Sequence, residues 1–289
     1  MKGDRLPALA YALPINCALG YPLYGTSVAF AQIYNTSLSS SQINQLYHEG
    51  IINIPESNAG LAGWYPLNGN ANDYSGYNNN GVPTNVVYVG LHNYTYDPSS
   101  RLNVYAFSKN VADFNLTKGS WISSHAVVLP DGTNTATITA WIKPKIVQGD
   151  NTYAGIVRID GSAGAGTGLL LSLQGSSGLP SMATWNNDFV PSSGPKVNYN
   201  TWNFVAVRIN GTDNALLYVN GQAESGTLSD SLVPSLKSGG YSTNFSIGST
   251  DSPGRLFNGS ISNVQVYNAS LNISQLPLLS FLVLSIKLL

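Results

Sequence analysis

Residues 200–222 read NTWNFVAVRINGTDNALLYVNGQ, a pattern that predicts two consecutive β-strands. Apolar and polar side chains alternate over residues 202–209, as they do in a strand that is buried on one face. One face carries Phe204, Ala206 and Arg208, and the other carries Val205, Val207 and Ile209. Residues 215–219 supply the second strand, and Asn220-Gly221 supplies a tight turn after it.

Other segments of the chain show the same pattern. Short apolar runs recur between stretches of Gly, Asn and Ser, which are typical of turns and loops. The further strands that we expect are residues 63–67, 137–143, 155–159, 168–173, 244–247 and 260–267. No long apolar stripe with the helical period of about 3.6 residues interrupts them. The sequence therefore predicts an all-β protein built as an antiparallel sandwich of two sheets.

The surface of this protein must be polar without being highly charged. Charged residues make up 9% of the 289 residues, against about 25% in an average soluble domain. The 13 Lys and Arg and the 14 Asp and Glu leave a net charge of −1, so we expect neither nucleic acid nor an anionic membrane as a partner. The sequence has no run of about 20 apolar residues, the length of a membrane-spanning helix. This composition is typical of extracellular or cell-surface β-proteins.

A segment near the start of the chain is repeated near its end. Residues 23–43 align without gaps on residues 256–276, and nine of the 21 positions are identical. Each copy has the pattern of a strand, a turn and the start of a helix, which residues 42–50 continue in the first copy. We therefore expect residues 1–54 to carry the closing strand and short helix of a preceding repeat. Residues 55–276 would then form the complete sandwich.

The last part of the chain, residues 277–289, departs from the repeat and alternates like an apolar strand. A strand of this kind needs the edge of a sheet to cover it, either in its own domain or in a neighbouring molecule. Together with the extra closing strand near the start, it would let copies of the chain complete one another's sheets. One alternative function is therefore a structural subunit of a surface filament or layer assembled by strand exchange.

Four motifs occur in a characteristic order along the chain. They are residues 62–82 (AGWYPLNGNANDYSGYNNNGV), 137–144 (TITAWIKP), the pair 200–211 and 216–222, and 257–272 (FNGSISNVQVYNASLN). Together they resemble the laminin-G-like, concanavalin A-like lectin/glucanase family. The resemblance implies an antiparallel jelly-roll β-sandwich over most of the chain, with short flanking segments. It leaves the function open, because this sandwich hosts lectins, adhesins, hydrolases and spacers.

The same resemblance raises the question of a calcium site. Many relatives hold calcium with an Asp of the loop after the first strand, an Asp of the last strand and a small acidic cluster. Here the loop keeps Asp73 beside Asn72, whereas the last strand has Ser262 and Asn263 in place of the Asp. Calcium takes about six to eight oxygen ligands, and useful affinity requires about two or more carboxylates. Either Asp73, Asn72 and Asn263 hold calcium, or Asp73 makes an Asx-turn; no other cofactor is expected.

Sugar-binding β-sandwiches typically place an aromatic platform beside amide and hydroxyl groups. Two parts of the sequence fit this description, an Asn-rich loop and a polar stretch around a single Trp. The candidate ligand-binding residues are Tyr74, Tyr77, Trp185, Asn187 and Asp188. The remaining aromatic residues of interest lie within hydrophobic strands, where we expect core packing. These are Trp64, Trp141 and Trp202.

The carboxylates of the chain argue against catalysis. Glycosidases on this fold resemble one another in a strand with two Glu flanking an Asp, because a retaining mechanism needs two carboxyl groups about 5 Å apart. The chain has three Glu, at positions 49, 56 and 224, and none lies in such a motif. Glu224 is expected on an exposed strand edge after the turn. We therefore expect a non-catalytic cell-surface module for adhesion or for binding a glycan or protein, with a glycan-active hydrolase as the least favoured alternative.

Glycosylation is a further expectation for an exported chain. An Asn-x-Ser/Thr sequon accepts an N-linked glycan where it lies on the surface of a secreted protein. The chain has eight such sequons, at Asn35, Asn93, Asn115, Asn210, Asn244, Asn258, Asn268 and Asn272.

Overall fold

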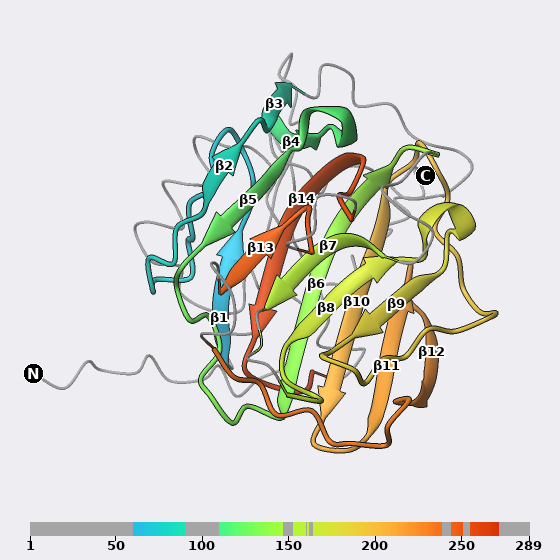
Figure 1. Cartoon of the computed structure of the whole chain (residues 1–289). Coiled ribbons are helices and arrows are strands. Elements are labelled where there is room, and N and C mark those ends of the chain that lie inside the picture. Colours follow the sequence, from blue (N-terminus) through green and yellow to red (C-terminus); the bar gives the residue numbers. More distant parts are fainter. Residues whose placement is uncertain are drawn as a thin grey trace, which may run out of the picture. The chain divides into compact units, whose positions relative to one another are not determined.

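The computed structural model describes residues 60–90, 110–146, 153–159, 161, 164–238, 244–250 and 255–271. In these ranges the chain forms 14 β-strands and two short 3₁₀-helices, and no α-helix (Figure 1). The two helices are η1 (Leu116–Lys118) and η2 (Gly175–Ser177). Within the same ranges no helix could cross a membrane, because none is long and apolar enough. The all-β class predicted from the alternating strands is confirmed.

Eight strands form the larger sheet: β1 (Leu61–Tyr65), β3 (Val87–Gly90), β4 (Asn110–Phe114), β6 (Thr135–Pro144), β10 (Asn203–Asn210), β11 (Asn214–Val219), β12 (Gln222–Thr227) and β14 (Gly259–Tyr267). They are ordered β12-β11-β10-β6-β14-β4-β3, and β1 also pairs with β14. All of these pairings are antiparallel. Residues 200–222 therefore contribute to the interior of this sheet.

The predicted pair of strands lies inside the larger sheet, next to its edge strand β12. In β10, Val205 pairs with Val219 of β11 on one side and with Ala140 of β6 on the other. Between β11 and β12, Asn220 and Gly221 have φ angles of 50° and 85°. Two successive residues with positive φ give the tight turn whose twist matches that of the flanking strands. The turn predicted at Asn220-Gly221 is thus present.

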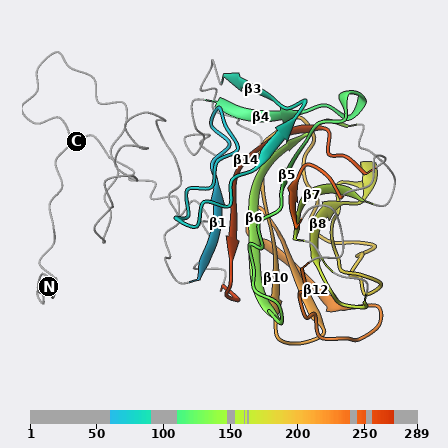
Figure 2. The same ribbon diagram turned by 60° about the vertical axis from the view of Figure 1, so that its left-hand side comes forward.

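Six strands form the smaller sheet: β2 (Val82–Thr84), β5 (Trp121–Ser124), β7 (Ala154–Ile159), β8 (Leu169–Leu173), β9 (Pro180–Ala183) and β13 (Phe245–Ile247). Their order is β2-β5-β13-β7-β8-β9, again with antiparallel neighbours. Figure 2 shows the two layers, with β6 and β10 in one and β7 and β8 in the other. The predicted sandwich of two antiparallel sheets is confirmed.

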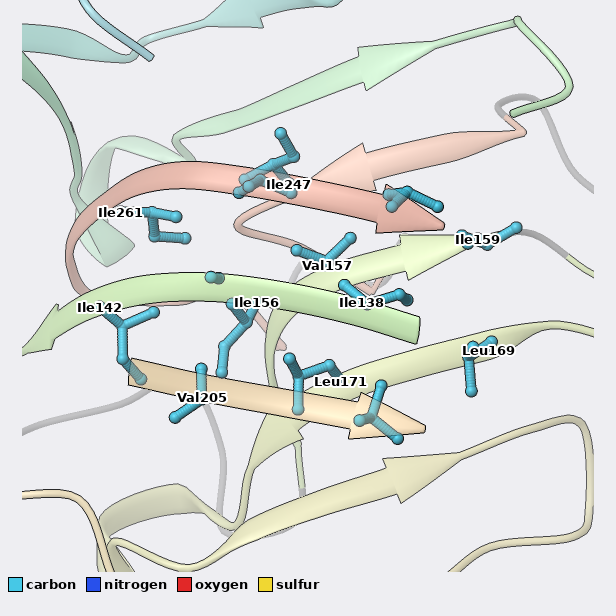
Figure 3. Close-up of a cluster of buried hydrophobic side chains, with 14 of the residues drawn as sticks. Ile138, Ile142, Ile156, Val157, Ile159, Leu169, Leu171, Val205, Ile247 and Ile261 are labelled. Carbon is cyan, nitrogen blue, oxygen red and sulfur yellow. The ribbon is translucent and has the colours of Figure 1, made fainter. Parts of the chain in front are cut away.

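The hydrophobic core fills the space between the two sheets. Ile142 and Val205 of the larger sheet and Val157 and Leu171 of the smaller one all lie in this core, with no exposed surface (Figure 3). Burying an aliphatic side chain of this size stabilises the fold by about 1.5–3 kcal/mol. The apolar face predicted for β10, which consists of Val205, Val207 and Ile209, belongs to the core as expected.

A second hydrophobic cluster lies on the opposite face of the larger sheet. Trp141 and Phe204 pack edge to face there, with their ring centroids 5.5 Å apart, and Trp202 belongs to the same cluster. Phe204 lies on this face because it alternates along β10 with residues of the inter-sheet core. The expected burial of Trp64, Trp141 and Trp202 is confirmed, since their exposed fractions are 1%, 2% and 8%.

All eight strands expected from the sequence are present, with ends that agree within two residues. The structure adds β2, β3, β4, β5, β9 and β12, which the sequence pattern did not indicate. The closing strand and helix expected in residues 1–54 lie outside the described residues, as does the strand-like tail at 277–289.

Candidate ligand-binding site

A cavity of about 340 Å³ opens on the smaller sheet, over β7, β8 and β9. Its floor consists of Arg158, Leu170 and Ala183, which pair with one another across the three strands. Their neighbours Val157 and Leu171 lie in the core between the sheets. Because successive side chains of a strand point to opposite faces, the floor faces away from that core. We refer to this cavity as the outer hollow.

Segments that flank the three strands build the walls of the outer hollow. The wall residues that carry aromatic, hydroxyl or charged groups are Tyr153, Thr184, Trp185, Asp188, Thr250 and Arg255. They come from the start of β7, from the loop after β9 and from the segment between β13 and β14. The outer hollow therefore rests on regular strands while its specific groups come from loops, as is common in binding sites.

Asn187 organises the loop after β9. Its side chain is fully buried, and Asn187 Oδ1 accepts a hydrogen bond from the Asp230 backbone N at 3.0 Å. Asn187 Nδ2 donates to the Leu232 carbonyl oxygen at 2.9 Å. The Thr184 hydroxyl donates to the Asn187 carbonyl oxygen at 2.6 Å, which closes the turn. Asn187, predicted to touch a ligand, thus lies beneath the loop and positions its neighbours.

Trp185 and Asp188 come together on the wall of the outer hollow, where the sequence placed them in one candidate group. The exposed fraction of Trp185 is 39%, which leaves much of the indole in contact with solvent. Asn186, between them, has a φ of 50°, a left-handed conformation that Asn tolerates better than most residues. This conformation bends the chain between Trp185 and Asp188, and both of these side chains line the cavity.

Tyr153 joins two charged groups at the rim. Its hydroxyl donates a hydrogen bond to Asp188 Oδ2 at 2.7 Å, and the Arg255 guanidinium carbon lies 5.2 Å from the centre of its ring. This distance allows a cation–π interaction. Asp188 Oδ1 also accepts a hydrogen bond from the Thr184 backbone N at 3.1 Å. The carboxylate is thereby held in a fixed orientation on the wall.

Arg158 adds a second guanidinium group to the outer hollow, in its floor. Its exposed fraction is 8%, although it belongs to the otherwise apolar strand β7. Burying a charge costs free energy unless polar partners compensate for it. Among the described residues that line the outer hollow, Arg158 and Arg255 are cationic and Asp188 is anionic. The lining can therefore offer apolar, hydrogen-bonding and cationic contacts.

The second candidate pair of aromatic residues lies elsewhere. Tyr74 and Tyr77 belong to the loop after β1 and do not line the outer hollow. The Tyr74 ring packs edge to face on Trp64, with centroids 6.3 Å apart, whereas the exposed fraction of Tyr77 is 67%. The structure therefore separates the two groups of candidates and places the one around Trp185 in the outer hollow.

Asp73 is the centre of a hydrogen-bond network within the loop after β1. Asp73 Oδ1 accepts hydrogen bonds from the backbone N of Trp64 and of Ser75, both at 2.9 Å. Asp73 Oδ2 accepts one from the Asn79 backbone N at 3.0 Å. The contact with Ser75, two residues on, is an Asx-turn. Because three N–H groups point at this carboxylate, its surroundings fit an ordered turn better than a calcium site.

The other two candidate metal ligands, Asn72 and Asn263, differ in exposure. Asn72 is exposed, and Asn263 Oδ1 accepts hydrogen bonds from Trp64 Nε1 at 2.9 Å and from Gln265 Nε2 at 3.2 Å. In the described part of the chain no group of three or more His, Cys, Asp or Glu could hold a metal ion. Asp73 and Asn263 each accept a hydrogen bond from Trp64, at its backbone N and at its Nε1, so both help to orient this residue.

Two tyrosines have raised pKa values, Tyr65 of β1 and Tyr88 of β3. Burial raises the pKa of Tyr65 far above its ordinary value, and the charge of Asp73 raises it further. The Tyr65 hydroxyl donates a hydrogen bond to the Asn79 carbonyl oxygen at 2.9 Å. The Tyr65 ring stacks on the Phe245 ring, with the two centroids 4.9 Å apart. Burial alone raises the pKa of Tyr88 to about 12. Both phenols therefore remain neutral over the physiological range.

Glu224 lies on β12, which forms one edge of the larger sheet. Its side chain is half-buried, and the neighbouring Gln222 is exposed. The edge position expected for this residue is therefore confirmed. Glu224 does not line the outer hollow.

Five of the predicted sequons fall in the described residues. Asn115 Oδ1 accepts hydrogen bonds from the Thr117 backbone N and hydroxyl at 3.0 and 2.7 Å, and Asn210 Oδ1 accepts one from the Thr212 hydroxyl at 2.7 Å. Asn268 is exposed. The others in this part of the chain are Asn244 and Asn258, whereas Asn35, Asn93 and Asn272 lie outside it.

The candidate residues predicted from the sequence did not include Tyr153, Arg158 or Arg255. For Arg158 a signal was present, because it is the one charge in a strand that otherwise reads AGIVI. A charge inside an apolar strand is costly and calls for a specific role. Tyr153 and Arg255 carried no comparable signal, since each lies in a polar stretch and reaches the site only through the fold.

Residues 116–276 match the family model of the concanavalin A-like lectin/glucanase superfamily. A comparison with curated protein sequences found no match. The matched residues include every strand from β5 to β14, and therefore both the floor and the walls of the outer hollow.

Several solved structures are similar to this chain. The binding domain of Paraclostridial mosquitocidal protein 1 matches with a TM-score of 0.50 and 17% identity, over 75% of this chain and 50% of that domain's chain. Domain 4 of AbnA, an extracellular arabinanase from Geobacillus stearothermophilus solved with arabinotriose, matches with a TM-score of 0.49 and 20% identity. The match covers 76% of this chain and 97% of the AbnA domain. The receptor-binding domain of botulinum neurotoxin type G matches with a TM-score of 0.41 and 18% identity. The match covers 76% of this chain and 50% of the toxin chain. This chain thus spans about half the length of the two toxin structures.

Proposed function

The chain belongs to the concanavalin A-like lectin/glucanase superfamily. We propose that it is a non-catalytic module that binds a glycan in the outer hollow. Membership of a superfamily sets the fold, whereas the function depends on the site that the fold carries. The proposal therefore rests on the residues of the hollow.

The observation that carries the proposal is the combination of Trp185 with polar groups in one cavity. A sugar ring has an apolar C–H face and a rim of hydroxyl groups, so it needs an aromatic surface beside hydrogen-bonding partners. Trp185 offers an indole that is 39% exposed, and Thr184 and Asp188 lie next to it on the same wall. The volume of about 340 Å³ falls within the range of about 300–1,000 Å³ that is usual for small-ligand pockets.

The carboxylates of the hollow support binding rather than hydrolysis. A retaining glycosidase needs two carboxyl groups about 5 Å apart, and an inverting one needs them about 6.5–9.5 Å apart. Among the described residues that line the hollow, Asp188 is the single carboxylate, and it already accepts hydrogen bonds from Tyr153 and Thr184. We therefore assign Asp188 to ligand contact and to orientation of the wall.

We place this binding activity outside the cell, in adhesion or in recognition of surface glycans or proteins. The support is the sequence, in which 9% of residues are charged and eight sequons are available. A surface rich in amides and hydroxyls offers many hydrogen-bonding groups to glycans. The proposal requires no cofactor, because the hollow uses side-chain and backbone groups only.

A glycan array probed with the intact chain and two variants tests the proposal. Trp185→Ala removes the aromatic surface of the hollow, and we expect affinity for the bound glycans to fall at least about tenfold, or about 1.4 kcal/mol. Tyr77→Ala is the matched control, since it removes an exposed aromatic ring from the loop after β1. Thermal unfolding must show that both variants remain folded at the temperature of the binding assay.

Two outcomes would contradict the proposal. If Tyr77→Ala abolished binding and Trp185→Ala did not, the glycan site would lie in the loop after β1. If the intact chain bound no glycan at all, the glycan-binding function itself would be wrong.

A further inference from the structure

The charges of the outer hollow narrow the class of its ligand. The described lining residues carry two guanidinium groups, those of Arg158 and Arg255, and one carboxylate, that of Asp188. We propose that the hollow recognises an acidic sugar, whose carboxylate is bound by these two arginines. The inference rests on the proposed glycan-binding function and adds the chemical class of the ligand.

The concentration of positive charge is unusual for this chain. The whole protein has 13 Lys and Arg in 289 residues and a net charge of −1, yet two of the cations line one cavity of about 340 Å³. Asp188 is bound on the wall by Tyr153 and Thr184, and each of its oxygens accepts one of these hydrogen bonds. The described lining residues thus carry two cations and one anion, and an excess of one charge favours a ligand group of the opposite charge.

The burial of Arg158 strengthens this preference. With an exposed fraction of 8%, its guanidinium lies in surroundings that screen charge less than water does, so an anion bound beside it is attracted more strongly. A guanidinium has five N–H donors and pairs with a carboxylate through two parallel hydrogen bonds. It can therefore keep contacts with its own chain and still bind a ligand carboxylate.

The positions of the groups suit a sugar that carries an acid. Arg158 lies in the floor and Trp185 in the wall, so the two contact different sides of a bound ligand. Trp185 would cover the C–H face of the ring, while the carboxylate would point toward the floor. Arg255, stacked at 5.2 Å on Tyr153, would close the rim over the same acid group.

Titration calorimetry with matched pairs of sugars tests the inference. The probes are oligogalacturonide against its methyl ester, and sialyllactose against lactose, because each pair differs by an acid group or by one acidic sugar. We expect the acid of at least one pair to bind at least tenfold more tightly than its neutral counterpart. Raising the salt concentration should weaken binding of the acid and leave the neutral sugar unchanged, because ions screen the attraction.

Three variants locate the effect. Arg158→Gln should abolish the preference for the acid, and Arg255→Gln should reduce it severalfold. Because Arg158 is buried, thermal unfolding must show that Arg158→Gln remains folded; Arg255 is exposed, so its variant gives an independent result. Lys118→Gln, which removes an exposed charge outside the hollow, should keep the full preference.

The outcomes separate this inference from the proposed function. Equal affinity for acid and neutral sugars, with binding still lost in Trp185→Ala, would overturn the inference and leave glycan binding in place. Tighter binding of a sulfated oligosaccharide than of every carboxylated probe would overturn the assignment of a carboxylate. No binding of any sugar would overturn both.

Discussion

The Tyr153 hydroxyl lies 2.7 Å from Asp188 Oδ2, so a residue that precedes β7 is hydrogen-bonded to a residue of the loop after β9. The two strands are separated by β8, and the contact bridges over that strand at the rim of the outer hollow. The same tyrosine ring carries Arg255 on its face. One side chain thus sets the positions of both charged wall residues.

Replacement of Tyr153 by Phe should weaken ligand binding at a cost of about 1 kcal/mol in stability. The ring and its contact with Arg255 are kept, while Asp188 loses one hydrogen bond, which is worth about 1 kcal/mol. We expect affinity for the bound glycan to fall about fivefold, measured by calorimetry. Tyr77→Phe, which removes the hydroxyl of an exposed tyrosine in another loop, should leave affinity unchanged. Equal affinities of all three proteins would show that the Tyr153–Asp188 contact does not shape the site.

The loop after β1 should depend on the charge of Asp73. Asp73→Asn replaces one acceptor oxygen by an NH₂ group that faces backbone N–H donors, so at least one of the bonds from Trp64, Ser75 and Asn79 is lost. Hydrogen bonds to a buried charge are worth about 1.5–3 kcal/mol each, so we expect a loss of about 3 kcal/mol in the free energy of unfolding, measured in urea. Asp230→Asn, at an exposed carboxylate, should change it by less than about 0.5 kcal/mol.

Much of the fold could be predicted from strands that alternate clearly. In β10, Val205 and Phe204 point to opposite faces, as the sequence indicated, because one face must be apolar to fill the core. The strands that escaped prediction have no such pattern. β12 reads QAESGT and is held by its pairing with β11, and β2 has three residues and includes Pro83. Edge strands of this kind depend on their neighbours rather than on their own side chains.

The site was only partly predictable. Trp185 and Asp188 were found because an aromatic residue among polar ones is typical of a binding loop. Arg255 lies 67 residues from Asp188 in the sequence, and only the order β13-β7-β8-β9 brings them to one cavity. Asn187 was chosen for its amide group, but whether an amide faces a ligand or the backbone depends on tertiary contacts. Sequence patterns report composition and period, and neither one determines those contacts.

Calcium should have little effect on stability. The oxygens of Asp73 already accept hydrogen bonds from three backbone N–H groups, and Asn263 Oδ1 accepts one from Trp64 Nε1. A metal ion would therefore have to compete with these hydrogen bonds. At tenfold its dissociation constant, a bound ion would stabilise the fold by about 1.4 kcal/mol and raise Tm by about 3–6 °C. We expect a difference below about 1 °C between EDTA and about 1 mM calcium, within the affinity range of extracellular calcium modules. A rise of several degrees that Asp73→Asn removes would establish a calcium site.

Alkaline pH should destabilise the protein through its buried phenols. Burial raises the pKa of Tyr65 and Tyr88 in the folded state, whereas an unfolded tyrosine titrates near pH 10. Below about pH 10 both states keep the proton and stability is unaffected; above it the unfolded state loses protons first, so stability falls as pH rises. For Tyr65 the slope is about 1.4 kcal/mol per pH unit.

Tyr65→Phe separates this effect from general alkaline damage. The variant loses the hydrogen bond to the Asn79 carbonyl and about 1 kcal/mol of stability at neutral pH. It also loses one titrating group, so its stability should decline less steeply above about pH 10 in urea unfolding. Parallel declines in the two proteins would show that Tyr65 does not titrate differently on folding.

Gly155 couples the packing of β7 to the rim of the outer hollow. A Cβ atom at this position would lie 2.6 Å from the Ser249 carbonyl carbon and 2.7 Å from Thr250 Cγ2, closer than real contacts allow. Gly155 also donates its backbone N–H to the Arg255 carbonyl oxygen at 3.1 Å. The absence of a side chain therefore lets the segments that carry Thr250 and Arg255 approach β7.

Gly155→Ala should accordingly affect both stability and binding. Overpacking against backbone costs about 1–3 kcal/mol, and the displaced segments would carry Thr250 and Arg255 away from the ligand. We expect a lower unfolding temperature together with a severalfold loss of affinity for the glycan that the intact chain binds. Gly164→Ala is the matched control, because its Cβ would lie 3.5 Å from its nearest neighbour, an ordinary contact. If Gly155→Ala lost stability but bound its glycan as tightly as the intact chain, Thr250 and Arg255 would have no part in recognition.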